Sequence, residues 1–254
     1  MEYLAVGVQM MIGDDLEENY RRMKFWAERV KFLYPHTKIL VFPELSLTGP
    51  VHPGMEEGEV IKRFSPLAEE YGLWLVPGSF YIKKGDGKVN RAYLFSPEGK
   101  VVGHYDKIYP WAPFEDSLPG SQVSVFSVEG LRVGIEICYD IWFPEVALEM
   151  AARGVDLIIN PVMTTTADRE GERVLVRATS LFTQSYLLSV NGLGRGGVGG
   201  SLGVGPEGEV LVEAQGEEVA LPLAVSTERL KSVRERGSFS SNRILKEFLK
   251  RREK

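Results

Sequence analysis

Short apolar runs alternate with amphipathic stretches along this 254-residue chain, and that alternation limits the possible folds more than any other feature. Residues 3–10 have the apolar pattern of a strand, and residues 38–42 form a candidate for a buried strand. Between them, Asp14 and Asp15 offer an N-cap to a helix whose apolar residues, from position 16 to position 33, lie on one face. This part of the chain therefore predicts strand, helix and strand in that order.

The same alternation continues to the end of the chain. Gly72 closes a second predicted helix, and Pro144 and Gly154 mark the start and the end of a third. Gly-rich and Pro-rich turns separate consecutive strands in the first half. The predicted helices are 57–71, 144–154, about 170–184 and a short basic helix at 243–252; the predicted strands lie within 73–105, at 131–137, at 155–160 and through most of 186–225.

Strands outnumber those that one doubly wound sheet would use, and two helices accompany the strands in each half of the chain. Two sheets stacked face to face, with helices on both outer sides, would accommodate this pattern. We therefore predict an α/β fold, a four-layer α-β-β-α sandwich. The sequence has no long linker, low-complexity stretch or short repeat, so residues 1–254 are expected to form a single domain.

The composition restricts the kinds of partner. Hydrophobic residues make up 44% of the chain and charged residues 26%, as in globular proteins, and the net charge is −5. This net charge lacks the basic character typical of proteins that bind nucleic acid or an anionic membrane. No basic segment precedes an apolar one at the N-terminus, and no apolar run is long enough for a membrane helix. The single cysteine suits a reducing compartment, so we predict a cytoplasmic protein.

Three potentially reactive residues follow predicted strands. Glu44 comes just after the strand at 38–42, Lys107 follows the stretch VVGHYD at 101–106, and Cys138 follows the strand at 131–137. In α/β folds, sites assemble at the carboxyl ends of strands. Cys138 also precedes a predicted helix start, where backbone amides and a nearby ammonium would favour the thiolate. Taken singly, each residue has a simpler explanation: a small buried cysteine, a solvated carboxylate and a surface lysine.

Motif context favours the reactive interpretation over the simpler one. The stretches that carry it are VFPEL at 41–45, YDKI at 105–108 and ICYD at 137–140, the last followed by FPE at 143–145. In order and spacing they resemble the motifs of the nitrilase superfamily of carbon–nitrogen hydrolases, and the resemblance extends from the first strand to about residue 230. Family-like positions also occur at 177–178, 191–192, 200–201, 206 and 208.

The resemblance implies an α-β-β-α sandwich, a Glu–Lys–Cys triad and a homodimer or larger homo-oligomer. Carried over by motif, Glu44 is the general acid and base, Lys107 stabilises the oxyanion and Cys138 is the nucleophile. The backbone N–H of Tyr139 is the second candidate donor to the oxyanion.

The segment after Lys107 is similar to the aliphatic amidase branch of the superfamily. There, a second glutamate and a nearby tryptophan line the substrate pocket, and Glu115 and Trp111 occupy the matching positions. Glu115 is therefore expected to be a catalytic residue that orients the substrate amide or water and helps to fix Lys107. Trp142 stands where many relatives carry arginine, and we expect it to line the pocket with Trp111 and Tyr139. Leu45 stands where aliphatic amidases usually have an aromatic residue. These differences leave the identity of the substrate open.

The predicted function is therefore that of a cysteine-dependent amidase, which releases ammonia and a carboxylic acid from a small amide through a thioester. Hydrolysis of an N-carbamoyl amine, an ω-amide or a nitrile by the same triad is the alternative, as is a non-catalytic scaffold that kept the fold. No cofactor is expected. The three histidines, His36, His52 and His104, show no metal-ligand spacing, and the Gly-rich run 192–205 lacks a phosphate-loop signature.

Overall fold

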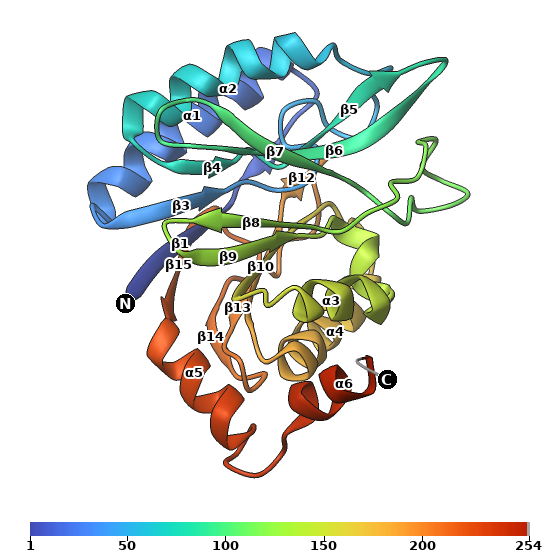
Figure 1. Ribbon diagram of the computed structural model, residues 1–254. Coiled ribbons are helices and arrows are strands. Elements are labelled where there is room, and N and C mark those ends of the chain that lie inside the picture. Colours follow the sequence, from blue (N-terminus) through green and yellow to red (C-terminus); the bar gives the residue numbers. More distant parts are fainter. Residues whose placement is uncertain (253–254) are drawn as a thin grey trace.

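The computed structural model describes residues 1–252, which form two β-sheets packed face to face between pairs of helices (Figure 1). The first sheet has seven strands, in the order β15-β1-β3-β4-β6-β5 with β7 paired to β6. Their bounds are β1 (Glu2–Gln9), β3 (Thr37–Val41), β4 (Trp74–Val76), β5 (Ser79–Lys84), β6 (Gly87–Phe95), β7 (Val101–Asp106) and β15 (Val219–Ser226).

The second sheet has six strands, in the order β14-β13-β11-β10-β9-β8. Its centre, β9-β10-β11, is parallel, and both edges are antiparallel. Their bounds are β8 (Ser124–Val128), β9 (Leu131–Ile135), β10 (Leu157–Val162), β11 (Tyr186–Asn191), β13 (Leu202–Val204) and β14 (Val210–Glu213). A further short pair, β2 (Met11–Ile12) with β12 (Leu193–Gly194), links the two halves of the chain.

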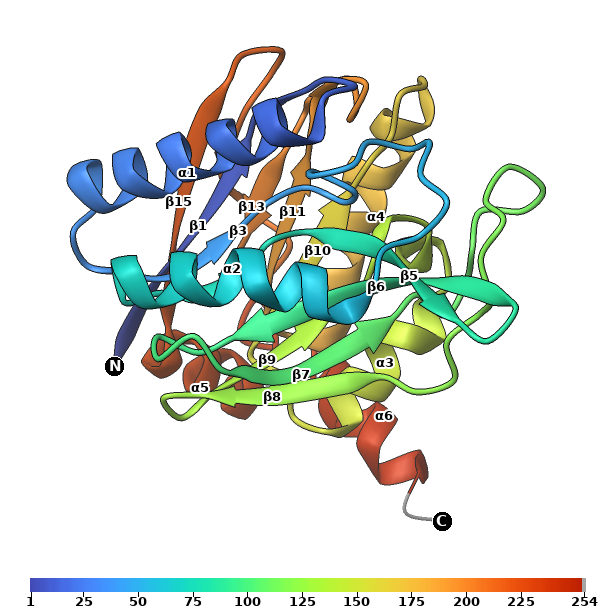
Figure 2. The same cartoon turned by 90° about the horizontal axis from the view of Figure 1, so that it is seen from above.

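Helices cover the outer face of each sheet. Figure 2 shows α1 (Leu16–Leu33) and α2 (Glu57–Tyr71) lying side by side over the first sheet, and Figure 1 shows α3 (Pro144–Ala152) and α4 (Asp168–Thr183) against the second. The chain then adds α5 (Thr227–Arg236) and α6 (Ile244–Arg252). The prediction of a four-layer α-β-β-α sandwich is confirmed.

The alternation of side chains along each strand divides the core into layers. On β1, Val6 and Val8 pack toward α1 and α2, while Ala5 packs between the sheets. On β10, Ile159 packs between the sheets and Ile158 packs toward α3 and α4. Because successive strand residues point to opposite faces, strands covered on both sides must be apolar throughout. That is the pattern by which these strands are recognised in the sequence.

In chain order, β1 and β15 are the first and last strands of the first sheet, and they lie next to each other in it. β1 pairs with β15 in antiparallel register over its whole length, from Glu2 opposite Ser226 to Gln9 opposite Val219. Its other edge pairs with β3 in parallel. β1 is therefore an interior strand with neighbours from distant parts of the chain.

Four elements have no counterpart among the predicted ones, and one of them is the two-residue strand β2. Helix α5 buries only Leu230 and Val233, so its apolar stripe is too thin to stand out in the sequence. Strand β8 is half exposed. A short 3₁₀ helix, η1 (Cys138–Trp142), lies between β9 and α3, so Cys138 does not directly precede an α-helix as expected.

The domain prediction for 1–254 includes residues 253–254, which lie outside the described residues. Among residues 1–252, no helix has the length and apolar character needed to cross a membrane.

Candidate active site

The predicted catalytic lysine lies between two carboxylates. Lys107 follows β7, and its Nζ is 3.0 Å from Oε1 of Glu44 and 2.7 Å from Oε2 of Glu115. The side chains of Lys107 and Glu44 are each 2% exposed, and that of Glu115 is 6% exposed. Glu44 comes from the segment after β3, so residues far apart in the sequence meet in one buried cluster, here called the lysine cluster (Glu44, Lys107 and Glu115).

Asn90, on β6, joins the two carboxylates and was not predicted. Its Nδ2 donates hydrogen bonds to Oε1 of Glu44 at 2.8 Å and to Oε1 of Glu115 at 2.9 Å. Lys107 also donates to Oε1 of Glu44, so both donors act on one oxygen and neither donates to Oε2. The only signal for Asn90 in the sequence is an amide side chain within an otherwise largely apolar strand.

Glu115 is the more heavily hydrogen-bonded carboxylate. In addition to Asn90 and Lys107, it accepts hydrogen bonds from the Trp111 backbone N–H at 2.9 Å and the Ser117 hydroxyl at 3.1 Å. Burial alone would raise its pKa, but the charge of Lys107 and these hydrogen bonds outweigh burial and lower the pKa. Glu115 is therefore held as an anion.

Glu44 shows the opposite shift. Burial raises its pKa, and the nearby charge of Glu115 raises it further. The attraction of Lys107 and a hydrogen bond from the Cys138 thiol act in the other direction but do not cancel these effects. The two carboxylates thus share one cation and differ in proton affinity, which is the pattern that separates a proton carrier from a fixed anion.

Cys138 begins η1 and has a left-handed backbone conformation, with φ of 47°. A non-glycine residue in this region is strained and is kept there only by its surroundings. Its side chain is buried, and burial together with the negative charge of Glu44 raises the pKa of the thiol well above its usual value, although Lys107 lowers it. The expected preference for the thiolate was wrong, because burial outweighs the ammonium. The side chain of Cys138 is therefore held as a thiol.

Asp140 connects the cysteine segment to the lysine segment. One carboxylate oxygen accepts hydrogen bonds from the Ile137 backbone N–H at 3.0 Å and the Tyr105 hydroxyl at 2.8 Å, and the other accepts one from the Tyr109 backbone N–H at 2.8 Å. Burial raises the pKa of Asp140 to about 6. It is part of the ICYD motif, but the sequence assigned it no role.

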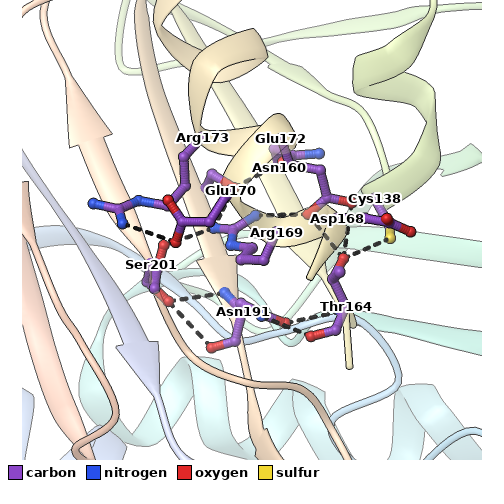
Figure 3. A network of polar contacts seen from close by, with 12 residues as sticks. Cys138, Asn160, Thr164, Asp168, Arg169, Glu170, Glu172, Arg173, Asn191 and Ser201 are labelled. Atoms are coloured by element: carbon purple, nitrogen blue, oxygen red, sulfur yellow. Dashed lines mark hydrogen bonds and ion pairs between the residues drawn. The ribbon is translucent and has the colours of Figure 1, made fainter. Parts of the chain in front are cut away.

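A second buried cluster adjoins Cys138 on the side of the second sheet and is called the arginine cluster (Thr164, Arg169 and Glu172). Figure 3 shows Thr164 between Cys138 and Glu172: its Oγ1 lies 3.8 Å from the cysteine Sγ and 2.8 Å from each carboxylate oxygen. Arg169 pairs with Glu172 at 3.1 Å. The Thr164 hydroxyl donates its one proton to the Glu172 carboxylate, and its oxygen remains in contact with the cysteine sulfur.

The family-like positions at 191–192 and 200–201 support this region. The amide oxygen of Asn191 accepts a hydrogen bond from the Thr164 backbone N–H at 3.0 Å, and the Asn191 side chain donates to the Thr164 backbone oxygen at 3.1 Å. The Ser201 hydroxyl accepts from the Asn191 N–H at 2.9 Å. These contacts, drawn in Figure 3, fix the loop that carries Thr164.

A pocket of about 260 Å³ opens beside Cys138. Its wall includes all three residues predicted to contact substrate, Trp111, Tyr139 and Trp142. Glu44, Lys107 and Glu115 are buried next to the cysteine and do not line the pocket, so Glu115 does not have the position in the pocket wall that was expected of it. The pocket wall also includes Asp168 and Glu172, neither of which was predicted. Both are on α4, where the sequence shows only the charged residues of an amphipathic helix.

Comparison with known proteins agrees with the fold and the motifs. Residues 5–235 match the family model of the carbon–nitrogen hydrolases. The chain belongs to this family, and its resemblance to the nitrilase superfamily is confirmed.

Individual relatives share about a third or less of their residues with this chain. Nitrilase homolog 2 of Dictyostelium discoideum is 31% identical over 174 residues, and the match spans 61% of this chain and about half (52%) of that protein. An (R)-stereoselective amidase from Pseudomonas sp. is 30% identical over 82% of this chain and 80% of its own length. A cysteine-to-alanine mutant of the amidase from Nesterenkonia sp. AN1, solved in complex with butyramide, is 25% identical with a TM-score of 0.81, over 92% of this chain and 94% of that one.

Proposed function

We propose that this protein is a cysteine-dependent amidase that converts a small carboxylic amide into ammonia and the carboxylic acid. The observation that carries the proposal is the buried Lys107, held between Glu44 and Glu115 beside the Cys138 thiol. Two carboxylates with opposite pKa shifts around one ammonium supply both a proton carrier and a fixed counter-charge. The amidase relatives support this choice of reaction within the family.

In the first half of the proposed reaction, Glu44 takes the proton of the Cys138 thiol, and the sulfur attacks the carbonyl carbon of the amide. The Lys107 ammonium and the Tyr139 backbone N–H stabilise the negative charge that forms on the carbonyl oxygen. Protonated Glu44 gives its proton to the departing nitrogen. The carbon–nitrogen bond breaks, ammonia leaves, and the acyl group remains on Cys138 as a thioester.

In the second half, Glu44 takes a proton from water, and the resulting hydroxide attacks the thioester carbon. The carbon–sulfur bond breaks, the carboxylic acid leaves, and the proton on Glu44 returns to the sulfur. Each half-reaction uses Glu44 once as base and once as acid, which requires a carboxyl whose pKa lies near the working pH. The raised pKa of Glu44 suits that role, and the lowered pKa of Glu115 suits a group that holds Lys107 without exchanging protons.

The test is ammonia release from short aliphatic amides, nitriles, N-carbamoyl amines and ω-amides, with the wild type beside Cys138→Ala. Amide turnover that is lost in the variant would support the proposal. Turnover of only a nitrile or a carbamoyl compound would keep the triad and reject the amidase assignment. If Cys138→Ala releases ammonia as fast as the wild type, or if neither does, the proposed chemistry is wrong.

We also propose a cytoplasmic homodimer or larger homo-oligomer, on the basis of the single cysteine and the family resemblance. Light scattering on the purified protein would measure the mass of the particle. A particle with the mass of one chain would reject the oligomer.

A further inference from the structure

The pocket beside Cys138 combines aromatic side chains with carboxylates. Trp111, Tyr139 and Trp142 contribute the aromatic part of the wall, and Asp168 and Glu172 contribute the acidic part. The two tryptophans are 37% and 40% exposed, so their rings remain accessible. Within residues 1–252, no lysine or arginine lines this pocket.

The positive charges near the pocket are already neutralised. The Lys107 ammonium is bound between two carboxylates. The Arg169 guanidinium pairs with Glu172 and directs its Nη2 to Ser189 Oγ at 3.1 Å and to the Gly200 backbone oxygen at 3.0 Å. In the proposed reaction Lys107 acts on the carbonyl oxygen, and Arg169 is already paired, so neither cation is available to hold a carboxylate on the acyl chain of a substrate.

Asp168, in contrast, carries a charge that nothing in the described part of the chain neutralises. It is an exposed side chain at the first position of α4, its one side-chain hydrogen bond comes from the Thr166 hydroxyl at 3.1 Å, and no cation lies within 4.0 Å of it in residues 1–252. The helix N-terminus next to it carries only about half a positive charge, so the carboxylate outweighs it. The pocket is therefore negative.

We propose that the pocket selects amides whose acyl chain ends in a protonated amine. An ammonium group there could lie over the faces of Trp111 and Trp142 and near the Asp168 carboxylate, which are the two environments that attract an organic cation. A carboxylate in the same place would be repelled by Asp168 and would find no basic partner. This inference rests on the proposed amidase reaction and adds the charge of the substrate to it.

The proposal can be tested with three amides of equal chain length that differ only in the terminal group. These are 5-aminopentanamide, which is a cation, hexanamide, which is neutral, and adipamate, which is an anion. We expect kcat/KM to be about tenfold higher for the cation than for hexanamide, and lower still for adipamate. Near 1 M salt, where the Debye length is about 3 Å, the preference for the cation should shrink.

Two variants on α4 separate the role of Asp168 from general charge. Asp168→Asn should lower the ratio of cation to hexanamide kcat/KM about threefold, whereas Glu170→Gln, which removes a charge outside this pocket, should leave the ratio unchanged. If Asp168 only stabilises the helix end, its substitution would change the melting temperature and not the ratio. That result would overturn the assignment of Asp168.

The outcomes distinguish this inference from the amidase proposal. Cys138-dependent turnover of hexanamide or adipamate at least as fast as that of 5-aminopentanamide would overturn the inference and leave the amidase in place. If none of the three is hydrolysed, calorimetry with Cys138→Ala decides. Tighter binding of 5-aminopentanamide than of hexanamide would support the charge preference, and equal or weaker binding would overturn it. The amidase proposal is then decided separately, by ammonia release from the panel of short amides, nitriles and carbamoyl amines.

Discussion

Cys138 adjoins two buried clusters that balance charge in different ways. In the lysine cluster, Glu44 and Glu115 share a single ammonium. In the arginine cluster, Glu172 pairs with the guanidinium of Arg169 and accepts a hydrogen bond from the hydroxyl of Thr164, and the cluster contains no second carboxylate. The first cluster has one negative charge too many for its cation, and the second is balanced.

The difference indicates which cluster can move a proton. Where two carboxylates share one cation, one becomes the fixed partner and the other holds its proton more tightly, and the pKa values of Glu115 and Glu44 move apart accordingly. A balanced pair has no such excess. We therefore infer that the lysine cluster carries out the chemistry and that the arginine cluster positions Thr164 against the cysteine.

The strongest test of this comparison replaces the carboxylate of each cluster with an amide. Glu44→Gln removes the proton carrier and should lower kcat by about 10²- to 10⁴-fold. Glu172→Gln keeps a hydrogen-bond acceptor for Thr164 and should cost about tenfold or less. Ammonia release under saturating amide measures both. Equal losses in the two variants would contradict the division of roles.

Replacing the cation of each cluster should separate rate from stability. Lys107→Met leaves Glu44 and Glu115 without a cation, so we expect a loss of about 3–5 kcal/mol in the free energy of unfolding and a loss of about a hundredfold in kcat. Arg169→Met leaves one buried carboxylate unpaired and should reduce stability similarly, with a smaller effect on kcat. Urea denaturation and initial rates measure the two quantities. A larger rate loss in Arg169→Met than in Lys107→Met would reverse the assignment.

The pH profile tests the interaction between Glu44 and Glu115. The reaction begins with ionised Glu44, so the acid limb of kcat/KM should follow the pKa of Glu44 and lie above the usual value of 4.5. The negative charge of Glu115 raises that pKa, so Glu115→Gln should move the acid limb to lower pH. A profile measured for both proteins on one neutral amide gives the shift. An acid limb that stays in place would mean that another group controls it.

Another buried carboxylate, that of Glu136, is expected to have the smallest effect on activity. Glu136 has no hydrogen-bond partner among the described residues, and burial and the charge of Asp140 raise its pKa from 4.5 to about 8. Between pH 4.5 and about 8, Glu136 therefore stays protonated in the folded protein and is ionised in the unfolded chain. Its contribution to the free energy of unfolding falls as the pH rises through this range. Glu136→Gln stays neutral and should gain stability over the wild type through this range.

Thermal unfolding at several pH values measures that gain. Because Glu136 lies outside the two clusters, kcat should change little. If the stability of the wild type and of the variant changes with pH in parallel, Glu136 does not stay protonated in the folded protein as its surroundings indicate.

The sequence predicted the layers and the residues of the lysine cluster for different reasons. Strand and helix periods identify the four layers because buried strands are apolar on both faces. Glu44, Lys107 and Cys138 stand out through family motifs and through their positions after strands. These side chains meet because β3, β7 and β9 end near one another. The expected sandwich implies that arrangement, but it does not give the distances between the side chains.

Several features could not be read from the sequence because they depend on tertiary packing. Arg169 and Glu172 look like the exposed face of a helix, yet both are buried and paired. Asn90 is one polar residue in a strand until the two carboxylates on either side of it are placed. The direction of the Cys138 pKa shift follows from burial, and a pattern of residue types gives no measure of burial at a loop.

The pairing of β1 with β15 also bears on synthesis of the chain. β1 leaves the ribosome well before its antiparallel partner β15, which ends at Ser226. Until that segment has emerged, the backbone N–H and C=O groups along one edge of β1 are unpaired. Such an edge can pair with a strand of another chain. The first sheet is therefore completed late, after the segments that carry Glu44, Lys107 and Cys138 have been made.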